Sequence, residues 1–334
     1  MSGVKVSQME RGEVPQVVEL WNSAVKAQGE GYERHFQSVD RLEKIIADPN
    51  FMPEGALTAR QDGELLGFAL GYVQTVDFLG VGDLGKIPGR IAGVAVRPDK
   101  WRQGIGTMLL SELEGILADK GKSEVSFPVY HEMPLALVRS IHLDSGPYYF
   151  LKANGYDDLV HGLVFHNDIA NFELKDSVIR KKERLEQEGY EFRWYQAEDG
   201  AELVKMVERC FYPAWHAIIR TAVSRDKLPE IFLVFAEGKI VGFIGPFDVK
   251  ERRFYFSTDS REGWGGFGSP GVDPAFQQRG IATVLWHWGL DHLRRSGAKF
   301  TEYGTGLINP AQHLYFHSGA TLIEISCDEI RKSL

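Results

Sequence analysis

Apolar residues recur along the 334-residue chain with two spacings, and the order of the resulting segments occurs twice. Apolar positions three or four residues apart predict amphipathic helices, and short apolar runs between turn residues predict strands. In the first half these patterns predict, in order, a strand at 4–8, helices at 13–25 and 38–47, a hairpin of 57–59 and 65–73, a strand at 91–96, a helix from 105 toward Gly121, a strand at 125–130, a helix at 133–141, a turn-rich segment at 146–156 and a strand at 160–167.

The second half repeats this order of predicted elements. Its patterns predict a strand at 190–195, helices at 199–211 and 213–223, a hairpin of 231–235 and 240–247, a strand at 253–257, a helix from 281 to about 296, a strand at 299–305, a helix at 311–318 and a strand at 322–327. Between the halves, residues 175–188 form a highly charged helical pattern with few apolar positions, which is typical of a solvent-exposed connector.

The repeat is clearest in a strand-turn-helix motif. Residues 271–283 read GVDPAFQQRGIAT and contain the spacing Q-x-x-G-x-A. Residues 96–107 align on 272–283 without a gap, at an offset of 176 residues. Small residues let the backbone turn tightly, so the N–H groups of the first helical turn face outward and can bind a phosphate or pyrophosphate. We therefore expect a tandem duplication with one such turn in each half.

Length and composition agree with two domains. A chain of 334 residues exceeds what one hydrophobic core usually organises. A hydrophobic content of 43% and a charged content of 25% are ordinary for a globular protein. We expect a first domain at 1–167, a charged connector at 168–189 and a second domain at 190–334.

Charge and cysteine content narrow the classes of partner. The net charge of −8 argues against nucleic acid or an anionic membrane and favours a cationic acceptor. Cys210 and Cys327 are isolated, so they predict neither a disulfide nor a thiolate metal site. No apolar run approaches the length of a membrane span, and the opening MSGVKVSQMERGEVP is too polar for a signal peptide. We expect a cytoplasmic location and no metal.

The order of elements and the two motif copies resemble the GNAT superfamily of N-acetyltransferases over almost the whole chain. The resemblance implies an α/β fold with an α+β mixed sheet: two acyl-CoA N-acyltransferase domains, each a mixed, mostly antiparallel central sheet flanked by helices. It implies acetyl-CoA as co-substrate, with its pyrophosphate on the motif's backbone amides and its acetyl end between two separating strands. The coenzyme contacts that it implies are Gly271, Val272, Gln277, Gln278, Arg279, Gly280, Ile281, Ala282, Thr283 and Asn309.

A segment after the motif adds a candidate acid. Residues 309–319 read NPAQHLYFHSG and resemble the family signature N-x-x-A-x-x-L-Y-x-x-x-G-F. The resemblance implies that Tyr315 is the general acid toward the departing thiolate. Asn309 lies one residue closer to this tyrosine than usual, and Ala320 stands where Phe or Tyr is common.

A carboxylate is expected to act as the base that takes a proton from the acceptor amine. Glu302, on the strand predicted after the motif helix, is our first candidate because that strand borders the expected cleft. Asp259 and Glu262 are the next candidates, and an ordered water is a further alternative.

The first half departs further from the family pattern. Trp101 occupies the usual Gln or Arg position, and Leu151 stands where the family has its tyrosine. Coenzyme binding through backbone N–H groups remains possible there, with Tyr148 or Tyr149 as alternative acids. The corresponding coenzyme contacts are Val96, Arg102, Gln103, Gly104, Ile105, Gly106 and Thr107. We expect the second half to be the active one.

The expected reaction is acetyl transfer from acetyl-CoA to a small-molecule amine, by direct attack within a ternary complex. Two alternatives stay open: a related tandem acyltransferase, of the mycothiol-synthase type or an aminoacyl transferase, and a coenzyme-binding regulatory module without turnover. The acceptor, the oligomeric state and the ability of the first half to bind acetyl-CoA are left open by the sequence.

Overall fold

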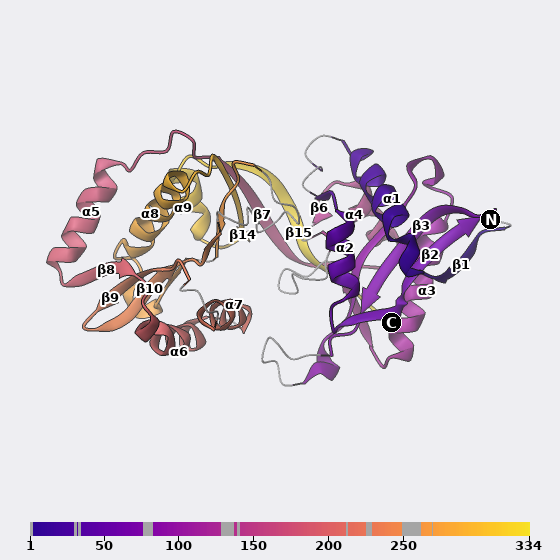
Figure 1. The fold of residues 1–334 in the computed structure, drawn as a ribbon, viewed down its shortest axis with the longest axis horizontal. Helices are drawn as coiled ribbons and strands as arrows, with labels where there is room; N and C mark the ends of the chain where they lie inside the picture. Colours follow the sequence, from indigo (N-terminus) through magenta and orange to yellow (C-terminus); the bar gives the residue numbers. More distant parts are fainter. Residues whose placement is uncertain are drawn as a thin grey trace.

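Two lobes joined by a long sheet make up the computed structural model (Figure 1). It describes residues 3–29, 32, 35–75, 83–127, 137, 138, 141–211, 213–224, 229–248, 262–268 and 270–334. The elements of the first lobe are β1 (Lys5–Gln8), α1 (Val14–Lys26), α2 (Val39–Ile46), β2 (Phe51–Gln61), β3 (Glu64–Tyr72), β4 (Gly89–Val96), α3 (Ile105–Asp119), β5 (Glu124–Phe127), β6 (Ile141–His142) and α4 (Gly146–Ala153).

The second lobe repeats this order of elements, as the sequence predicts. Its elements are α5 (Asp176–Gln187), β8 (Tyr190–Trp194), α6 (Gly200–Cys210), α7 (Pro213–Val223), β9 (Phe232–Ala236), β10 (Lys239–Ile244), β11 (Phe247–Asp248), β12 (Gly266–Phe267), β13 (Gly271–Val272), α8 (Ile281–Arg295), β14 (Phe300–Gly306) and α9 (Ala311–His317). Two long strands, β7 (Asp157–Asp168) and β15 (Thr321–Ser333), run between the lobes (Figure 1).

Local signals account for where many elements begin and end. The Ser38 side chain caps α2 by accepting a hydrogen bond from the Arg41 N–H. The β2–β3 turn places Asp62 at φ 51° and Gly63 at φ 85°, as a tight hairpin turn requires. One expectation is wrong at its end: Ile141 lies in β6, which pairs with β15, rather than in a helix. The rest of that predicted helix lies largely outside the described residues, as do 128–130 and the predicted strand at 253–257.

The sheets are mixed and mostly antiparallel, with helices packed against them, which confirms the expected fold class. The largest sheet has the order β1-β2-β3-β4-β5-β15-β7-β14, and a second sheet has the order β13-β10-β9-β8. Among the described strand pairs, β4 and β5 run parallel, and the other pairs run antiparallel. Among the described residues, no helix combines the length and the apolar character needed to cross a membrane.

The two halves exchange their last strands. β15, at the end of the second half, lies between β5 and β7, and it pairs with β5 through Ile330 and Phe127. Conversely, β7, at the end of the first half, lies between β15 and β14 and pairs with β14 from Gly162 to Asp168. The sequence predicts both strands but not their partners, because pairing between distant segments leaves no local pattern.

The hydrophobic cores follow the exchange. Cys327 and Ile330 of β15 are buried in the core that contains α1 and α3 of the first half. Leu163 and Phe165 of β7 are buried in the core that contains α8 of the second half. Each core therefore includes side chains from the opposite half of the sequence.

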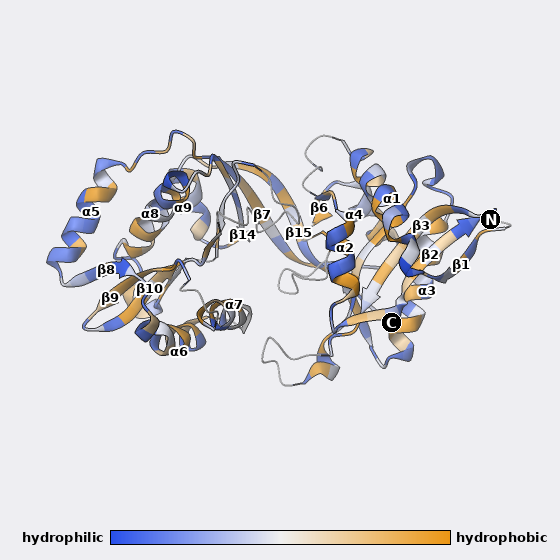
Figure 2. Cartoon of the chain, in the orientation of Figure 1, coloured by the Kyte–Doolittle hydropathy of each residue, from blue (hydrophilic) through white to orange (hydrophobic). Residues whose placement is uncertain are grey.

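α5 lies against the second lobe. Most of α5 is coloured as hydrophilic in Figure 2. Most of its residues are exposed, but Val178 and Leu185 are buried. These two apolar residues, seven apart on one helix face, anchor α5 where it packs on α8.

We predict that Ile330→Ala, a substitution in the last strand, destabilises the first lobe. Ile330 is 0% exposed, and removal of a buried isoleucine side chain beyond Cβ costs about 3 kcal/mol. Hydrogen exchange should report the loss of protection in α3 and β5. Ile325→Ala, at a position that is 43% exposed in the same strand, is the control and should cost well under that. A loss of protection confined to residues 190–320 would contradict this prediction.

Candidate active site

The turn between β13 and α8 is closed by its own side chains. β13 pairs with β10 through Val272 opposite Gly242 and Gly271 opposite Phe243. The Gln277 Nε2 donates a hydrogen bond back to the Val272 carbonyl at 3.2 Å. Gln278 at φ 62° and Gly280 at φ 95° then reverse the chain into α8, and the second of these left-handed positions favours glycine.

The start of α8 offers a neutral set of donors. The Val284 N–H donates to the Gly280 carbonyl at 3.2 Å, which is the first bond of the helix. The N–H groups of Ile281, Ala282 and Thr283 precede that bond and have no acceptor within the helix. Arg279 is held beside them because its Nη1 donates to the Tyr190 hydroxyl at 3.0 Å. Donors of this kind at a helix N-terminus suit a phosphate group.

The first half contains the same turn. The Trp101 Nε1 donates to the Val96 carbonyl at 2.7 Å, as Gln277 does to Val272. Arg102 at φ 63° and Gly104 at φ 81° repeat the left-handed positions. Trp101 therefore makes the same hydrogen bond to the backbone that glutamine makes in the second half, although the two side chains differ. The turn leads through Gln103 into α3, where Ile105, Gly106 and Thr107 form the first helical turn.

The central strands of the second half separate. β13 and β14 belong to different sheets, and a parallel bridge joins Trp264, before β12, to Phe300, the first residue of β14. In the first half, β4 and β5 are joined near their starts by two parallel pairs, Gly89 with Val125 and Arg90 with Ser126. At the offset of 176 residues the bridge falls beside the first of these pairs, so each half joins its central strands where they begin.

Glu302 has a carboxylate oxygen without a partner among the described residues. It lies on β14, it is 8% exposed, and in the part of the chain that the structure describes its Oε2 has no hydrogen-bond partner. Its Oε1 lies 3.8 Å from the Nδ1 of His166, the residue opposite it on β7. A buried carboxylate oxygen without a partner is costly, so it marks a place for a donor from outside the chain. Asp259, an alternative base, lies outside the described residues, and Glu262 is exposed.

Tyr315 and Glu302 lie on opposite faces of β14. Tyr315, on α9, is 5% exposed and packs against Tyr303, the neighbour of Glu302 along β14, with ring centroids 4.6 Å apart. Because successive strand residues point to opposite faces, Glu302 points away from Tyr315. The Asn309 side chain accepts a hydrogen bond from the Ala311 N–H at 3.0 Å and so begins α9.

The corresponding position of the first half is occupied by the chain itself. Arg90 reaches across from β4: its Nη1 hydrogen-bonds the Ser126 hydroxyl and lies 3.8 Å from the Glu329 carboxylate. Leu137 covers Gly93, where an added Cβ would lie 2.6 Å from the leucine Cδ1. The Leu137 N–H also donates to the Ala92 carbonyl at 3.0 Å, beside the irregularity in the β3–β4 pairing.

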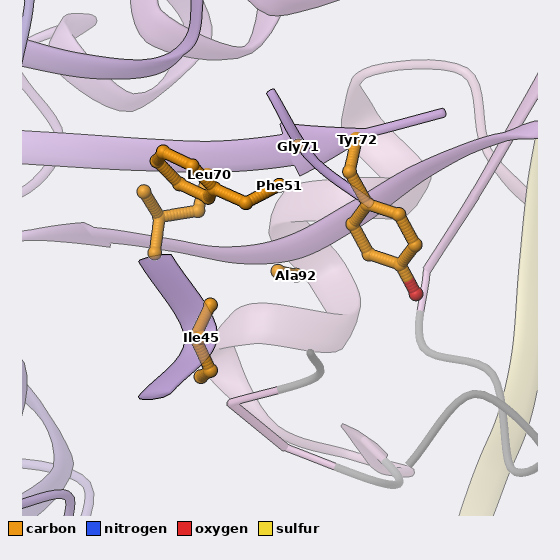
Figure 3. Close-up of a pocket in the computed structure, with 6 residues that line it drawn as sticks. All are labelled: Ile45, Phe51, Leu70, Gly71, Tyr72 and Ala92. Carbon is orange, nitrogen blue, oxygen red and sulfur yellow. The ribbon is translucent and has the colours of Figure 1, made fainter. Parts of the chain in front are cut away.

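A small apolar hollow remains beside this covered region. It is lined by Ile45, Phe51, Leu70, Gly71, Tyr72 and Ala92, with the side chains of α2 and β2 closing over the sheet (Figure 3). Its lining is almost entirely hydrocarbon. Tyr72 brings a hydroxyl to this lining, and none of the six lining residues carries a carboxylate or an imidazole that could act as a base.

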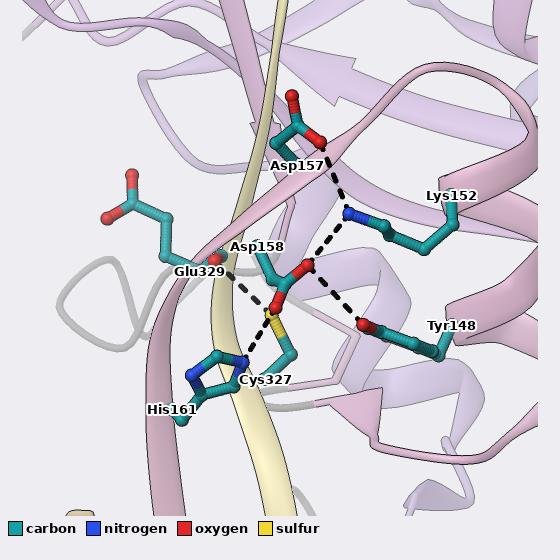
Figure 4. Close-up of polar contacts among 7 residues, drawn as sticks. All are labelled: Tyr148, Lys152, Asp157, Asp158, His161, Cys327 and Glu329. Carbon is teal, nitrogen blue, oxygen red and sulfur yellow. Dashed lines mark hydrogen bonds and ion pairs between the residues drawn. The ribbon is translucent and has the colours of Figure 1, made fainter.

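The alternative acids of the first half are already hydrogen-bonded. The Tyr148 hydroxyl donates to Asp158 Oδ1 at 3.3 Å, and Asp158 also meets Lys152 and His161, each at 2.8 Å (Figure 4). The Lys152 hydrogen bond lowers the pKa of Asp158 to about 2. Burial and the Asp158 charge raise the pKa of Tyr148. The Tyr149 hydroxyl donates to Asp144 at 2.6 Å, and Leu151 at the family's tyrosine position is buried.

Two residues near the second site have no signal in the sequence. His166 reaches Glu302 because β7 crosses between the halves. Lys181 of α5 lies against Gly280. Only the tertiary packing brings either residue to the motif.

Comparison with known families identifies one match in each half. The model of the acetyltransferase (GNAT) family matches residues 17–134 and 185–322, together well over half of the chain. No curated protein matches the sequence.

Several solved structures share the fold. A GCN5-related glucosamine N-acetyltransferase region of a fungal multi-domain GH3 β-N-acetylglucosaminidase aligns with a TM-score of 0.76 at 14% identity, over 99% of this chain and 38% of that one. A GCN5-related N-acetyltransferase from Sphaerobacter thermophilus gives 0.67 at 17%, over 100% and 96%. A tandem GNAT protein from the clavulanic acid biosynthesis pathway gives 0.65 at 13%, over 99% and 98%. At these identities the likeness shows the fold alone.

Proposed function

Because the chain belongs to the GNAT family of acetyltransferases, we propose that its second half transfers an acetyl group from acetyl-CoA to a small-molecule amine within a ternary complex. The observation that carries this proposal is the closed turn at Gly280 beside two strands that belong to different sheets. The turn supplies donors for phosphate, and the separation supplies a place for the acetyl end.

The chemistry divides between the coenzyme and the chain. When bound, acetyl-CoA supplies an activated thioester. The carboxylate of Glu302 takes the proton that the attacking amine loses, since its Oε2 is buried and has no partner among the residues that the structure describes. The hydroxyl of Tyr315 gives a proton to the departing thiolate. The opposite placement of these two groups suits a transfer that passes between the strands, with amine on one face and thiolate on the other.

The first half is proposed to be structural. Arg90 and Leu137 fill the region beside β4 in which an acceptor and an acetyl group would have to meet. Tyr148 and Tyr149 each donate to an aspartate, and Leu151 has no proton to give. The turn at Gly104 keeps the backbone form of a phosphate site without this chemistry.

The acceptor is proposed to be a small cationic amine. The chain carries a net charge of −8, and Glu302 places a carboxylate beside the separated strands. The fungal β-N-acetylglucosaminidase that shares the fold is named for a glucosamine N-acetyltransferase region, which makes amino sugars a first group to test here.

Calorimetric titration with acetyl-CoA should give one binding site per chain. Thr283→Glu places a negative charge on the first turn of α8, where it favours the helix but repels phosphate, and should weaken binding roughly tenfold or more. Thr107→Glu, the aligned change on α3, is the matched control and should leave the affinity unchanged. Two equivalent sites, or equal losses from the two variants, would contradict the assignment to the second half.

Tyr315→Phe should lower turnover about 100-fold because the thiolate then lacks a positioned acid. Coenzyme affinity should change little, since the ring that packs against Tyr303 remains. Steady-state release of thiol across a panel of amines measures turnover. Tyr303→Phe removes a neighbouring buried hydroxyl that accepts a hydrogen bond from Asn167 at 3.0 Å, and it should cost stability rather than turnover. Full turnover in Tyr315→Phe would remove the acid assignment.

Glu302→Gln should lower kcat/KM about 100-fold near neutral pH, because the amide cannot take a proton. The loss should shrink as the pH approaches the pKa of the acceptor amine, since the amine then arrives deprotonated. The pH profile of kcat/KM for wild type and variant measures this difference. Glu262→Gln changes an exposed carboxylate on the turn before β12 and serves as the comparison. A loss seen in Glu262→Gln instead would reassign the base.

A further inference from the structure

Lys181 of α5 lies directly on the turn of the proposed coenzyme site. A Cβ built on Gly280 would lie 2.7 Å from the Lys181 Cδ and 3.4 Å from its Nζ. The lysine stem therefore occupies the space that a side chain at position 280 would need. Its ammonium group stands beside the N–H groups that begin α8.

Neighbouring contacts fix the position of α5 over this turn. The Arg184 Nη2 donates to the Arg279 carbonyl at 3.1 Å, three residues beyond Lys181 on the helix. At the other end, the Lys175 Nζ donates to the His317 carbonyl at 2.8 Å. Val178 and Leu185 are buried on the same side. Lys181 is therefore held over the turn from both ends of its helix.

Lys181 differs from the lysine next to it. Lys182 forms an ion pair with Glu186 and lies over the rings of Phe192 and Trp288. Lys181 is half-buried, and in the part of the chain that the structure describes its ammonium has neither a hydrogen-bond nor an ion-pair partner. A half-buried ammonium without an anion gains most when an anion binds beside it.

The charges around this turn favour an anion. Burial is the main cause that lowers the pKa of His287 on α8, and the positive charges of Lys175 and Lys181 add to it. The partial positive charge of the helix N-terminus has the same sign. The turn at Gly280 thus combines backbone N–H donors and Arg279 of the motif with a cation from α5.

We infer that Lys181 is a coenzyme-binding residue that neutralises the pyrophosphate of coenzyme A at the Gly280 turn. This inference rests on the proposed function. It assigns to the segment between the two repeats a role in binding: α5 adds a second cation to the turn, beside Arg279 of the motif. The flexible lysine stem allows the ammonium to follow the phosphate when it binds.

Calorimetric titration of the full chain with CoA and with dephospho-CoA tests this inference at low and high salt. Lys181→Met should weaken binding of both ligands by the same factor, roughly tenfold at low salt, and by less at high salt. Lys181→Arg keeps the charge and should stay within about threefold of wild type. Arg180→Met removes one charge from the neighbouring, exposed position of α5 and should leave both affinities unchanged.

The outcomes separate this inference from the proposed function. If wild type binds both ligands and Lys181→Met binds them equally well, Lys181 is no ligand, while the proposed function stands. Tighter binding by Lys181→Met would show that the lysine occludes the turn, and a loss for CoA alone would place it on the 3′-phosphate; either overturns the assignment to the pyrophosphate. If wild type binds neither ligand, both proposals fail.

Discussion

The antiparallel pairing of β7 with β15 is the interaction on which the rest of the structure depends. Nine residue pairs, from Thr321 opposite His166 to Arg331 opposite Asp157, join the ends of the two repeats. Each strand then continues into the sheet of the other half. Because Ile330 closes the core of the first half and Phe165 belongs to that of the second, neither core is complete without the exchange.

The exchange also shapes the candidate site. Glu302 lies opposite His166 because β7 runs beside β14, so a residue from the first repeat stands within 3.8 Å of the proposed base. The first half supplies a strand to the second whatever its own turn binds. Arg90 and Leu137 pack beside β4 and stabilise the first lobe there.

Interactions between residues close in sequence made most helices and hairpins of this fold predictable. Helix caps such as Ser38, turn residues such as Asp62 and Gly63, and apolar periodicity depend on residues close in sequence, so α1, α2, α3, α8 and the hairpins agree with their predicted ranges. The two copies of the motif could be recognised because Pro274 and Gly280 keep the spacing of Pro98 and Gly104. The sequence did not reveal that Trp101 and Gln277 are equivalent, because two different side chains make the same hydrogen bond.

The sequence by itself determined the two repeats, their elements, the two turns of the kind that binds phosphate, and the family resemblance. Each of these depends on residue types at spacings of a few residues. Only the tertiary structure decided which strands pair across the halves and that α5 places Lys181 on Gly280. It also decided that Glu302 has an oxygen without a partner among the described residues, while its counterpart Ser126 contacts Arg90. These outcomes depend on contacts between residues far apart in the chain. No local pattern encodes such contacts, because the free energy that selects them comes from packing and pairing in the complete fold.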